Sequence, residues 1–109
     1  MQVRALVLAA GLLWPVSVFS QSTGPAFLNG NDLYEKCRQA GDHAYCMAYI
    51  MGAVDAFAYD GTLCPSLDVT EAQVQDMVMN LLRADPQTHH YAASNIVKAA
   101  LERAFPCKK

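Results

Sequence analysis

The chain has 109 residues, and its eight basic and ten acidic side chains give a formal net charge of −2 at pH 7. This length predicts one domain, near the size at which a hydrophobic core alone leaves only a small net stability. The sequence has no basic stripe, so nucleic acid is not an expected partner. Its mild acidity is compatible with a basic protein partner, although it is also ordinary for a soluble domain.

The first twenty residues have the pattern of a signal peptide. Arg4 and the amino terminus form a short positive region, residues 5–14 are apolar, and Pro15 ends the apolar run. Val18 and Ser20 suit the −3 and −1 positions of a cleavage site. The apolar run is well short of the ~20 residues that a membrane-spanning helix needs, so we predict a cleaved signal and not a membrane anchor.

We therefore expect a signal peptide over residues 1–20, a polar N-terminal arm over 21–30 and a helical domain over 31–109. The exported chain would lie in an oxidising compartment, with no membrane association after the signal is removed. Its four cysteines fit this compartment, because an even number of cysteines after an export signal predicts disulfide bonds. Their spacings do not match those of a zinc site.

The first helix is expected to begin near Asn31, an acceptable N-cap, and to end at Gly41. A long central helix then starts near Cys46 and stops at Asp60-Gly61, because glycine after a helix can adopt the left-handed conformation. The apolar residues of this helix recur at three- and four-residue steps, the period of one buried face. They are Met47, Ile50, Met51, Val54, Phe57 and Ala58.

Two residues of the central helix are unusual for a generic helix. Gly52 costs about 1 kcal/mol relative to alanine, so it predicts a close approach of backbone or side chain. Asp55 lies one residue from the apolar stripe and is expected to be a half-buried hydrogen-bond acceptor. We interpret both as structural residues, so replacing Gly52 with leucine is expected to damage folding before it damages binding.

The third helix is marked by a capping box, in which Thr70 can accept from the Gln73 amide while the Gln73 side chain reaches back. Its apolar stripe consists of Val74, Met77, Val78, Leu81 and Leu82. The fourth helix is expected to have Asp85 as its N-cap and Pro86 at its first position, and to continue until Pro106 stops it.

No window shows the period-two alternation of a strand. The predicted fold is all-α, a small four-helix antiparallel bundle stapled by two disulfides. In this topology Cys37 and Cys46 face each other across a turn, and the end of the fourth helix brings Cys107 back to the loop that carries Cys64. We therefore predict the bridges Cys37–Cys46 and Cys64–Cys107.

No arrangement in the sequence predicts catalysis. A disulfide removes the thiolate that a cysteine nucleophile needs, and neither a phosphate-binding glycine loop nor a serine nucleophile motif is present. His89 and His90 are expected at the surface near the start of the fourth helix, about 100° apart, so they cannot both face one metal. We expect no catalytic residue, no metal and no cofactor.

A set of glycine, cysteine, proline, polar and apolar positions spans nearly all of the exported chain in a specific order. It consists of Gly30, Asn31, Asp32, Leu33, Cys37, Cys46, Tyr49, Ile50, Gly52, Asp55, Ala56, Cys64, Pro65, Val69, Thr70, Gln73, Pro86, His90, Ala93, Ala104, Phe105, Pro106 and Cys107. This order resembles the Rap/Tai immunity-protein family. The resemblance implies a periplasmic helical protein that binds and blocks a peptidoglycan amidase effector delivered by type VI secretion, commonly as a homodimer that places a loop in the effector's cleft.

The predicted function is therefore non-enzymatic inhibition of a cell-wall amidase by steric occlusion. The family motif does not determine the contact residues, which are expected on a connecting loop, either 62–69 or 85–90. We favour the second loop, which carries Asp85, Gln87, His89 and His90.

Two alternatives remain open from the sequence. One is a periplasmic chaperone or stress-response helical protein of unknown partner. The other is an enzyme that uses Asp55 as a general base.

Overall fold

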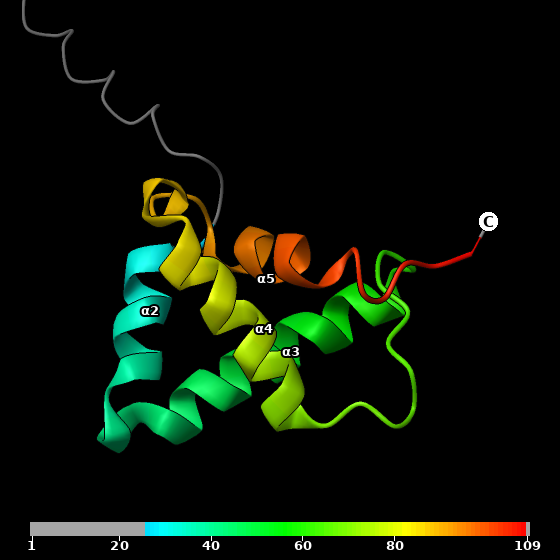
Figure 1. The fold of residues 1–109 in the computed structure, drawn as a ribbon, viewed down its shortest axis with the longest axis horizontal. Helices are drawn as coiled ribbons and strands as arrows, with labels where there is room; N and C mark the ends of the chain where they lie inside the picture. Colours follow the sequence, from blue (N-terminus) through cyan, green and yellow to red (C-terminus); the bar gives the residue numbers. More distant parts are fainter. Residues whose placement is uncertain (1–25, 109) are drawn as a thin grey trace, which may run out of the picture.

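The computed structural model describes residues 26–108, which form four α-helices and two single-turn 3-10 helices (Figure 1). The elements are α2 (Gly30–Arg38), η3 (Ala40–Asp42), α3 (His43–Tyr59), α4 (Glu71–Ala84), η4 (Pro86–Thr88) and α5 (Ala93–Leu101). Within this part of the chain the only β pairing is an isolated bridge between Asn29 and Ala92. The all-α prediction is confirmed. The predicted signal peptide and residues 21–25 of the predicted arm lie outside the described residues.

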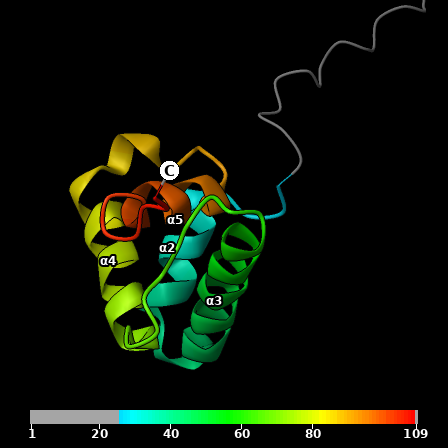
Figure 2. The same cartoon turned by 90° about the vertical axis from the view of Figure 1, so that its right-hand side faces the viewer.

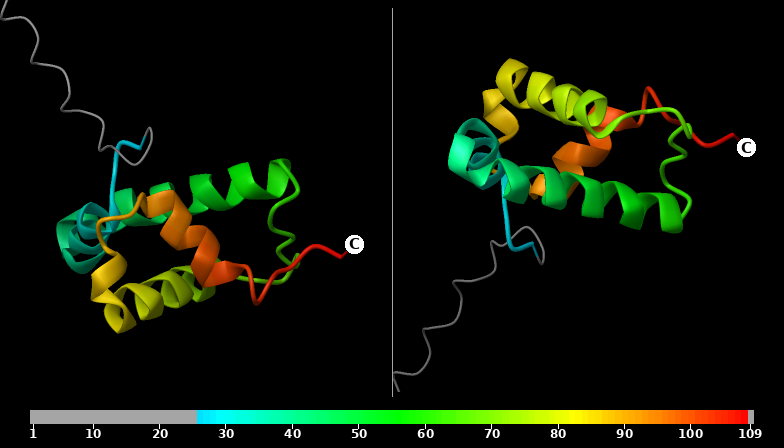
Figure 3. Two further views of the ribbon diagram at one scale, coloured as in Figure 1. Left: turned by 90° about the horizontal axis from the view of Figure 1, so that it is seen from above. Right: turned by 90° about the horizontal axis from the view of Figure 1, so that it is seen from below.

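Helices α3 and α4 run beside each other in opposite directions, and α5 crosses between them (Figure 3). The shorter helix α2 stands across one end of this layer and is seen nearly end-on in the same views. At the opposite end, the segment after α3 crosses over to the start of α4, close to the C-terminal segment (Figure 2). None of the described helices has both the length and the apolar character that crossing a membrane requires.

The core is built from one face of each helix. Its largest fully buried side chains are Leu33, Cys46, Ile50, Leu63, Val78, Leu82, Val97 and Leu101. The stripe predicted for the third helix is confirmed, because Val74, Val78 and Leu82 are buried and Met77 and Leu81 are partly buried against them. Leu63 belongs to the loop after α3, so this connection is also anchored in the core.

Both α2 and α4 begin with a reciprocal capping box. At α4 the Gln73 amide donates to Thr70 Oγ1 at 3.1 Å and the Thr70 amide donates to Gln73 Oε1 at 2.8 Å, as predicted. Helix α2 begins earlier than predicted, because Asn29 and not Asn31 is the N-cap. A box needs a polar side chain three residues after the cap, and Asp32 supplies it for Asn29.

The predicted fourth helix is shorter at both ends, since α5 covers only Ala93–Leu101. Pro86 starts a single 3-10 turn and no α-helix follows directly. The carbonyls of His89 and Tyr91 accept hydrogen bonds from the Asn31 and Gly30 amides at the start of α2. A helix through this region would need those carbonyls for its own amides, so pairing with α2 ends the turn.

The two glycine interpretations have different outcomes. Gly61 has a φ of 81° directly after α3, so the predicted stop at Asp60-Gly61 is confirmed. Gly52 is exposed, and a Cβ placed on it would have no contacting atom within 4 Å, so the expected close approach is wrong. Asp55 is also exposed and not half-buried. The predicted apolar face of α3 is confirmed except at Ala58, which is exposed, and both Gly52 and Asp55 lie on the outward face.

Both predicted disulfides are confirmed. Cys37–Cys46 joins the last turn of α2 to the first turn of α3, with Cα atoms 4.9 Å apart. Cys64–Cys107 joins the segment between α3 and α4 to the C-terminal segment, with Cα atoms 5.0 Å apart. The two bridges therefore tie down opposite ends of the molecule, and the described cysteines are all paired.

Candidate protein-binding surfaces

The first candidate surface is the connection between α4 and α5, residues 85–92, which contains the four predicted contact residues. His89 lies under this surface and is only 8% exposed, so its expected surface position is wrong. Its Nε2 lies 2.6 Å from the Leu82 carbonyl and its Nδ1 lies 3.2 Å from Asn31 Oδ1. Its ring also packs against Tyr34, with centroids 5.2 Å apart. His89 therefore holds the connection to α2 and α4.

The other predicted contact residues remain accessible to different degrees. Gln87 and His90 are exposed, whereas Asp85 is partly buried. The Thr88 hydroxyl and amide both donate to the Asp85 carbonyl, which fixes the turn. The connection is therefore a short hydrogen-bonded turn with Gln87 and His90 at its surface.

Tyr91 also belongs to this surface, although the sequence reasoning missed it. The residue is 47% exposed, and its ring lies against the His90 ring, with centroids 4.2 Å apart. It contributes to a largely apolar cavity of about 220 Å³ whose other walls are Leu81, Asp85, Thr88, Asn95, Ile96 and Ala99. An exposed tyrosine beside two histidines was the available signal, because tyrosine is enriched where proteins meet.

The second candidate surface is the connection between α3 and α4, residues 60–70. It is held at its start by Asp60, whose carboxylate accepts from the Thr62 amide at 2.9 Å and from the Thr62 hydroxyl. Further along, the Cys64 amide donates to the Phe105 carbonyl at 2.9 Å, beside the Cys64–Cys107 bridge. The connection is therefore fixed to the C-terminal segment by a covalent bond and a hydrogen bond.

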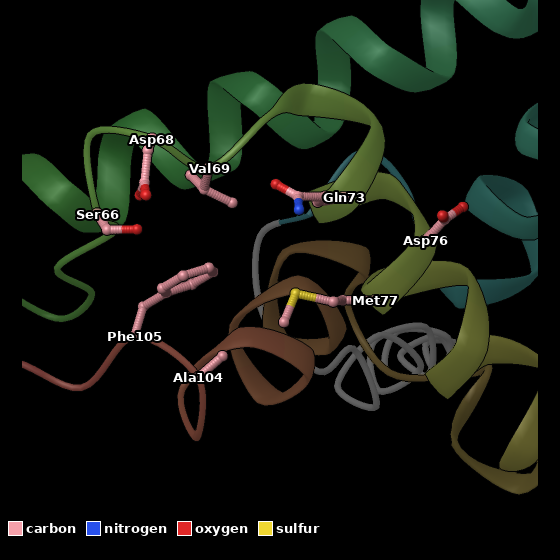
Figure 4. A pocket seen from close by; sticks show the side chains of 8 residues that line it. All are labelled: Ser66, Asp68, Val69, Gln73, Asp76, Met77, Ala104 and Phe105. Carbon is pink, nitrogen blue, oxygen red and sulfur yellow. The ribbon is translucent and has the colours of Figure 1, made fainter.

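A surface cavity of about 450 Å³ opens between this connection, the first turns of α4 and the C-terminal segment (Figure 4). It is lined by Ser66, Asp68, Val69, Gln73, Asp76, Met77, Ala104 and Phe105. Leu67, between two of the lining residues, is fully exposed. The cavity thus combines an apolar interior with two carboxylates.

The grouping and ionisation of titratable side chains bear on metal binding and catalysis. Within residues 26–108, no group of three His, Cys, Asp or Glu side chains could hold a metal ion. Burial raises the pKa of Tyr49 above its ordinary value, against the lowering effect of hydrogen bonding to Ser94, so this phenol stays neutral near pH 7. Asp55, the base considered for an enzyme, lines neither cavity.

Comparison with known proteins gives a family assignment. The model of the Rap1a immunity proteins matches residues 29–107, which includes all four helices, both disulfides and both candidate surfaces. A search of curated proteins found no match. A search of solved structures found none either. Because the family match covers well over half of the sequence, the chain belongs to the Rap1a immunity protein family.

Proposed function

We propose that this chain is a periplasmic immunity protein that binds a peptidoglycan amidase effector of type VI secretion and blocks it sterically. The family match over residues 29–107 carries the proposal, because an immunity protein acts against a secreted effector. The two disulfides support an oxidising compartment. The signal-peptide pattern in residues 1–20 supports export to the periplasm. Inhibition needs no catalytic residue, since occupying the cleft is sufficient.

The 85–92 connection is the proposed contact with the effector. Gln87, His90 and Tyr91 are exposed there, while the buried His89 and the bonded Asp85 carbonyl hold the backbone in place. A projection that is already ordered loses little conformational entropy when it binds. In this proposal the buried His89 holds the loop in position and does not touch the effector. The exposed Gln87 and His90 make the contacts.

Alanine replacement of both Gln87 and His90 is expected to weaken effector binding by about 10- to 100-fold, the range of a small interface hot spot. The wild-type chain should protect cells that export a candidate amidase, and the double variant should protect them less. Calorimetry of the purified pair gives the dissociation constant. Gln39→Ala is the matched control, because Gln39 is an exposed polar residue at the other end of α2.

Two results would count against this assignment, and they are distinguishable. If the double variant binds as tightly as the wild type, the contact lies elsewhere on the chain. If the wild-type chain neither binds nor protects against amidases of any effector class, the amidase proposal itself fails.

We also propose a homodimer through the outward face of α3. Ala44, Ala48, Gly52 and Ala56 recur every fourth residue on this helix and are all exposed. Residues at this spacing lie on one helix face, and small side chains let a second helix approach closely. Within one chain no atom lies close to Gly52 on this face. We propose that the α3 helix of a second copy packs there.

Gly52→Leu is expected to dissociate this dimer without unfolding the chain. Leucine is about 0.8 kcal/mol more favourable than glycine in a helix interior, and no neighbouring atom within the chain obstructs it. Sedimentation velocity should show a monomer, while thermal unfolding at a fixed low concentration should occur no lower than in the wild type. A monomeric wild type, or a variant that stays dimeric, would exclude this interface.

A further inference from the structure

The walls of the cavity beside the 60–70 connection are held in place by covalent and hydrogen bonds. The Cys64–Cys107 bridge and the bond from the Cys64 amide to the Phe105 carbonyl hold two of its sides together. The third side is the start of α4, which the Thr70–Gln73 capping box fixes. Its volume of about 450 Å³ lies within the range of roughly 300–1,000 Å³ that is usual for binding pockets. The cavity therefore exists before any partner arrives.

The charged side chains that line the cavity are all acidic. Val69, Met77, Ala104 and Phe105 provide apolar surface, and Asp68 and Asp76 provide carboxylates, with no basic residue among the lining side chains. Figure 4 shows Asp68 on the connection, on the same side of the cavity as the Phe105 ring, and Asp76 on α4 at the far side, with its carboxylate turned away from that ring. Within residues 26–108 neither aspartate forms an ion pair; the pairs there are Lys36–Asp42 and Glu35–Arg38. Among the described residues, therefore, no basic side chain already occupies either carboxylate.

We infer that this cavity binds an arginine side chain, flanked by an apolar residue, on a partner protein. The long apolar stem of arginine can cover Val69 and Met77 while its charged head reaches a carboxylate. Its planar guanidinium can also stack on an aromatic ring such as Phe105 and pair with a carboxylate through two hydrogen bonds. The fully exposed Leu67 offers the neighbouring contact for the apolar residue.

A polypeptide fits these features better than a small cation does. Leu67 extends apolar surface beyond the cavity itself. The Gln73 side chain uses its Oε1 for the capping box, which leaves its amide group as a donor for a backbone carbonyl. The 60–70 connection and the C-terminal segment, which line the cavity, lie at the opposite end of the molecule from the 85–92 connection (Figure 1). The cavity therefore stands independently of the proposed effector contact.

The test is a titration of the exported chain with the capped tripeptide acetyl-Leu-Arg-Leu-amide, followed by the backbone amide signals of the protein. The neutral control peptide carries citrulline in place of arginine. The signals of Val69, Met77 and Phe105 should shift and saturate with the arginine peptide. Affinity should be about tenfold lower for the citrulline peptide, because the charge-assisted pairs are lost, and it should fall as salt is raised.

Two double variants distinguish a specific effect of the cavity carboxylates on peptide binding from an effect of the net charge of the protein. Asp68→Asn combined with Asp76→Asn should weaken the arginine peptide by about tenfold. Asp55→Asn combined with Glu102→Gln changes the net charge equally at exposed positions outside the cavity and should leave the affinity unchanged. Equal binding of both peptides, shifts scattered over the surface, or equal effects of the two double variants would overturn the inference. None of these outcomes bears on amidase inhibition.

Discussion

Replacing Cys64 and Cys107 together with alanine is expected to lower the free energy of unfolding by about 4 kcal/mol. The bridge closes a separation of 43 residues, and its removal lets the unfolded chain gain the corresponding conformational entropy. A domain of this size has a small net stability, so the variant should be largely unfolded at modest denaturant concentrations. Urea unfolding followed by circular dichroism measures the change.

The control for this variant is Ser66→Ala, a change at an exposed position of the same connection that should leave the midpoint nearly unchanged. The Cys37–Cys46 bridge spans only nine residues, for which the same argument gives about 3 kcal/mol. Alanine at the buried Cys46 also removes core packing and the Gln75 contact to its sulfur. A loss below about 1 kcal/mol for the Cys64–Cys107 variant would contradict the chain-entropy argument.

Gly30→Ala is expected to destabilise the fold by about 3 kcal/mol, although only one methyl group is added. A Cβ at this position would lie 2.8 Å from the His89 Cα and carbonyl oxygen, and 2.5 Å from Ile96 Cδ1. The Ile96 side chain can move, but the His89 backbone is held by its bond from the Asn31 amide. The strain therefore falls on the pairing between α2 and the 85–92 connection.

Gly41→Ala is the matched control, because a Cβ on Gly41 meets nothing within 4 Å. The free energy of unfolding of the Gly41→Ala variant should stay within about 0.5 kcal/mol of that of the wild type. In Gly30→Ala, hydrogen exchange should also accelerate at the amides of Gly30 and Asn31, which donate to Tyr91 and His89. A Gly30→Ala variant as stable as the control would show that the close packing is not required.

Features set by residues near one another in the chain were predictable from the sequence. The capping box of α4 joins Thr70 to Gln73, and the stop after α3 needs only Gly61. The Cys37–Cys46 bridge spans a single helical hairpin. The Cys64–Cys107 bridge was predictable because an antiparallel fourth helix brings Cys107 back to the loop that carries Cys64. The bridge is present although that helix ends earlier than predicted. These predictions depend on periodicity and on chain reversal, which local patterns contain.

The candidate surfaces were only partly predictable. The sequence pointed to both connections, but it did not distinguish the anchor His89 from the exposed His90, since the two are adjacent and identical. Their difference depends on the Leu82 carbonyl and on Asn31, which is 58 residues away in the chain. The cavity beside the 60–70 connection likewise needs Phe105 from the C-terminal segment and Met77 from α4. No local pattern contains such a combination.

The sequence by itself determined the four helices, the two disulfides and the resemblance to a family of immunity proteins. Only the tertiary structure decided that Gly30 and not Gly52 is the closely packed glycine, and that the chain from Pro86 to Ala92 does not continue as an α-helix. The physical reason is the same in both cases. A glycine within a helical pattern does not reveal which atoms will lie beside it, and a carbonyl can accept from its own helix or from another segment. The contact between α2 and the 85–92 connection, which are far apart in the sequence, places the His89 backbone beside Gly30 and gives the His89 and Tyr91 carbonyls their partners.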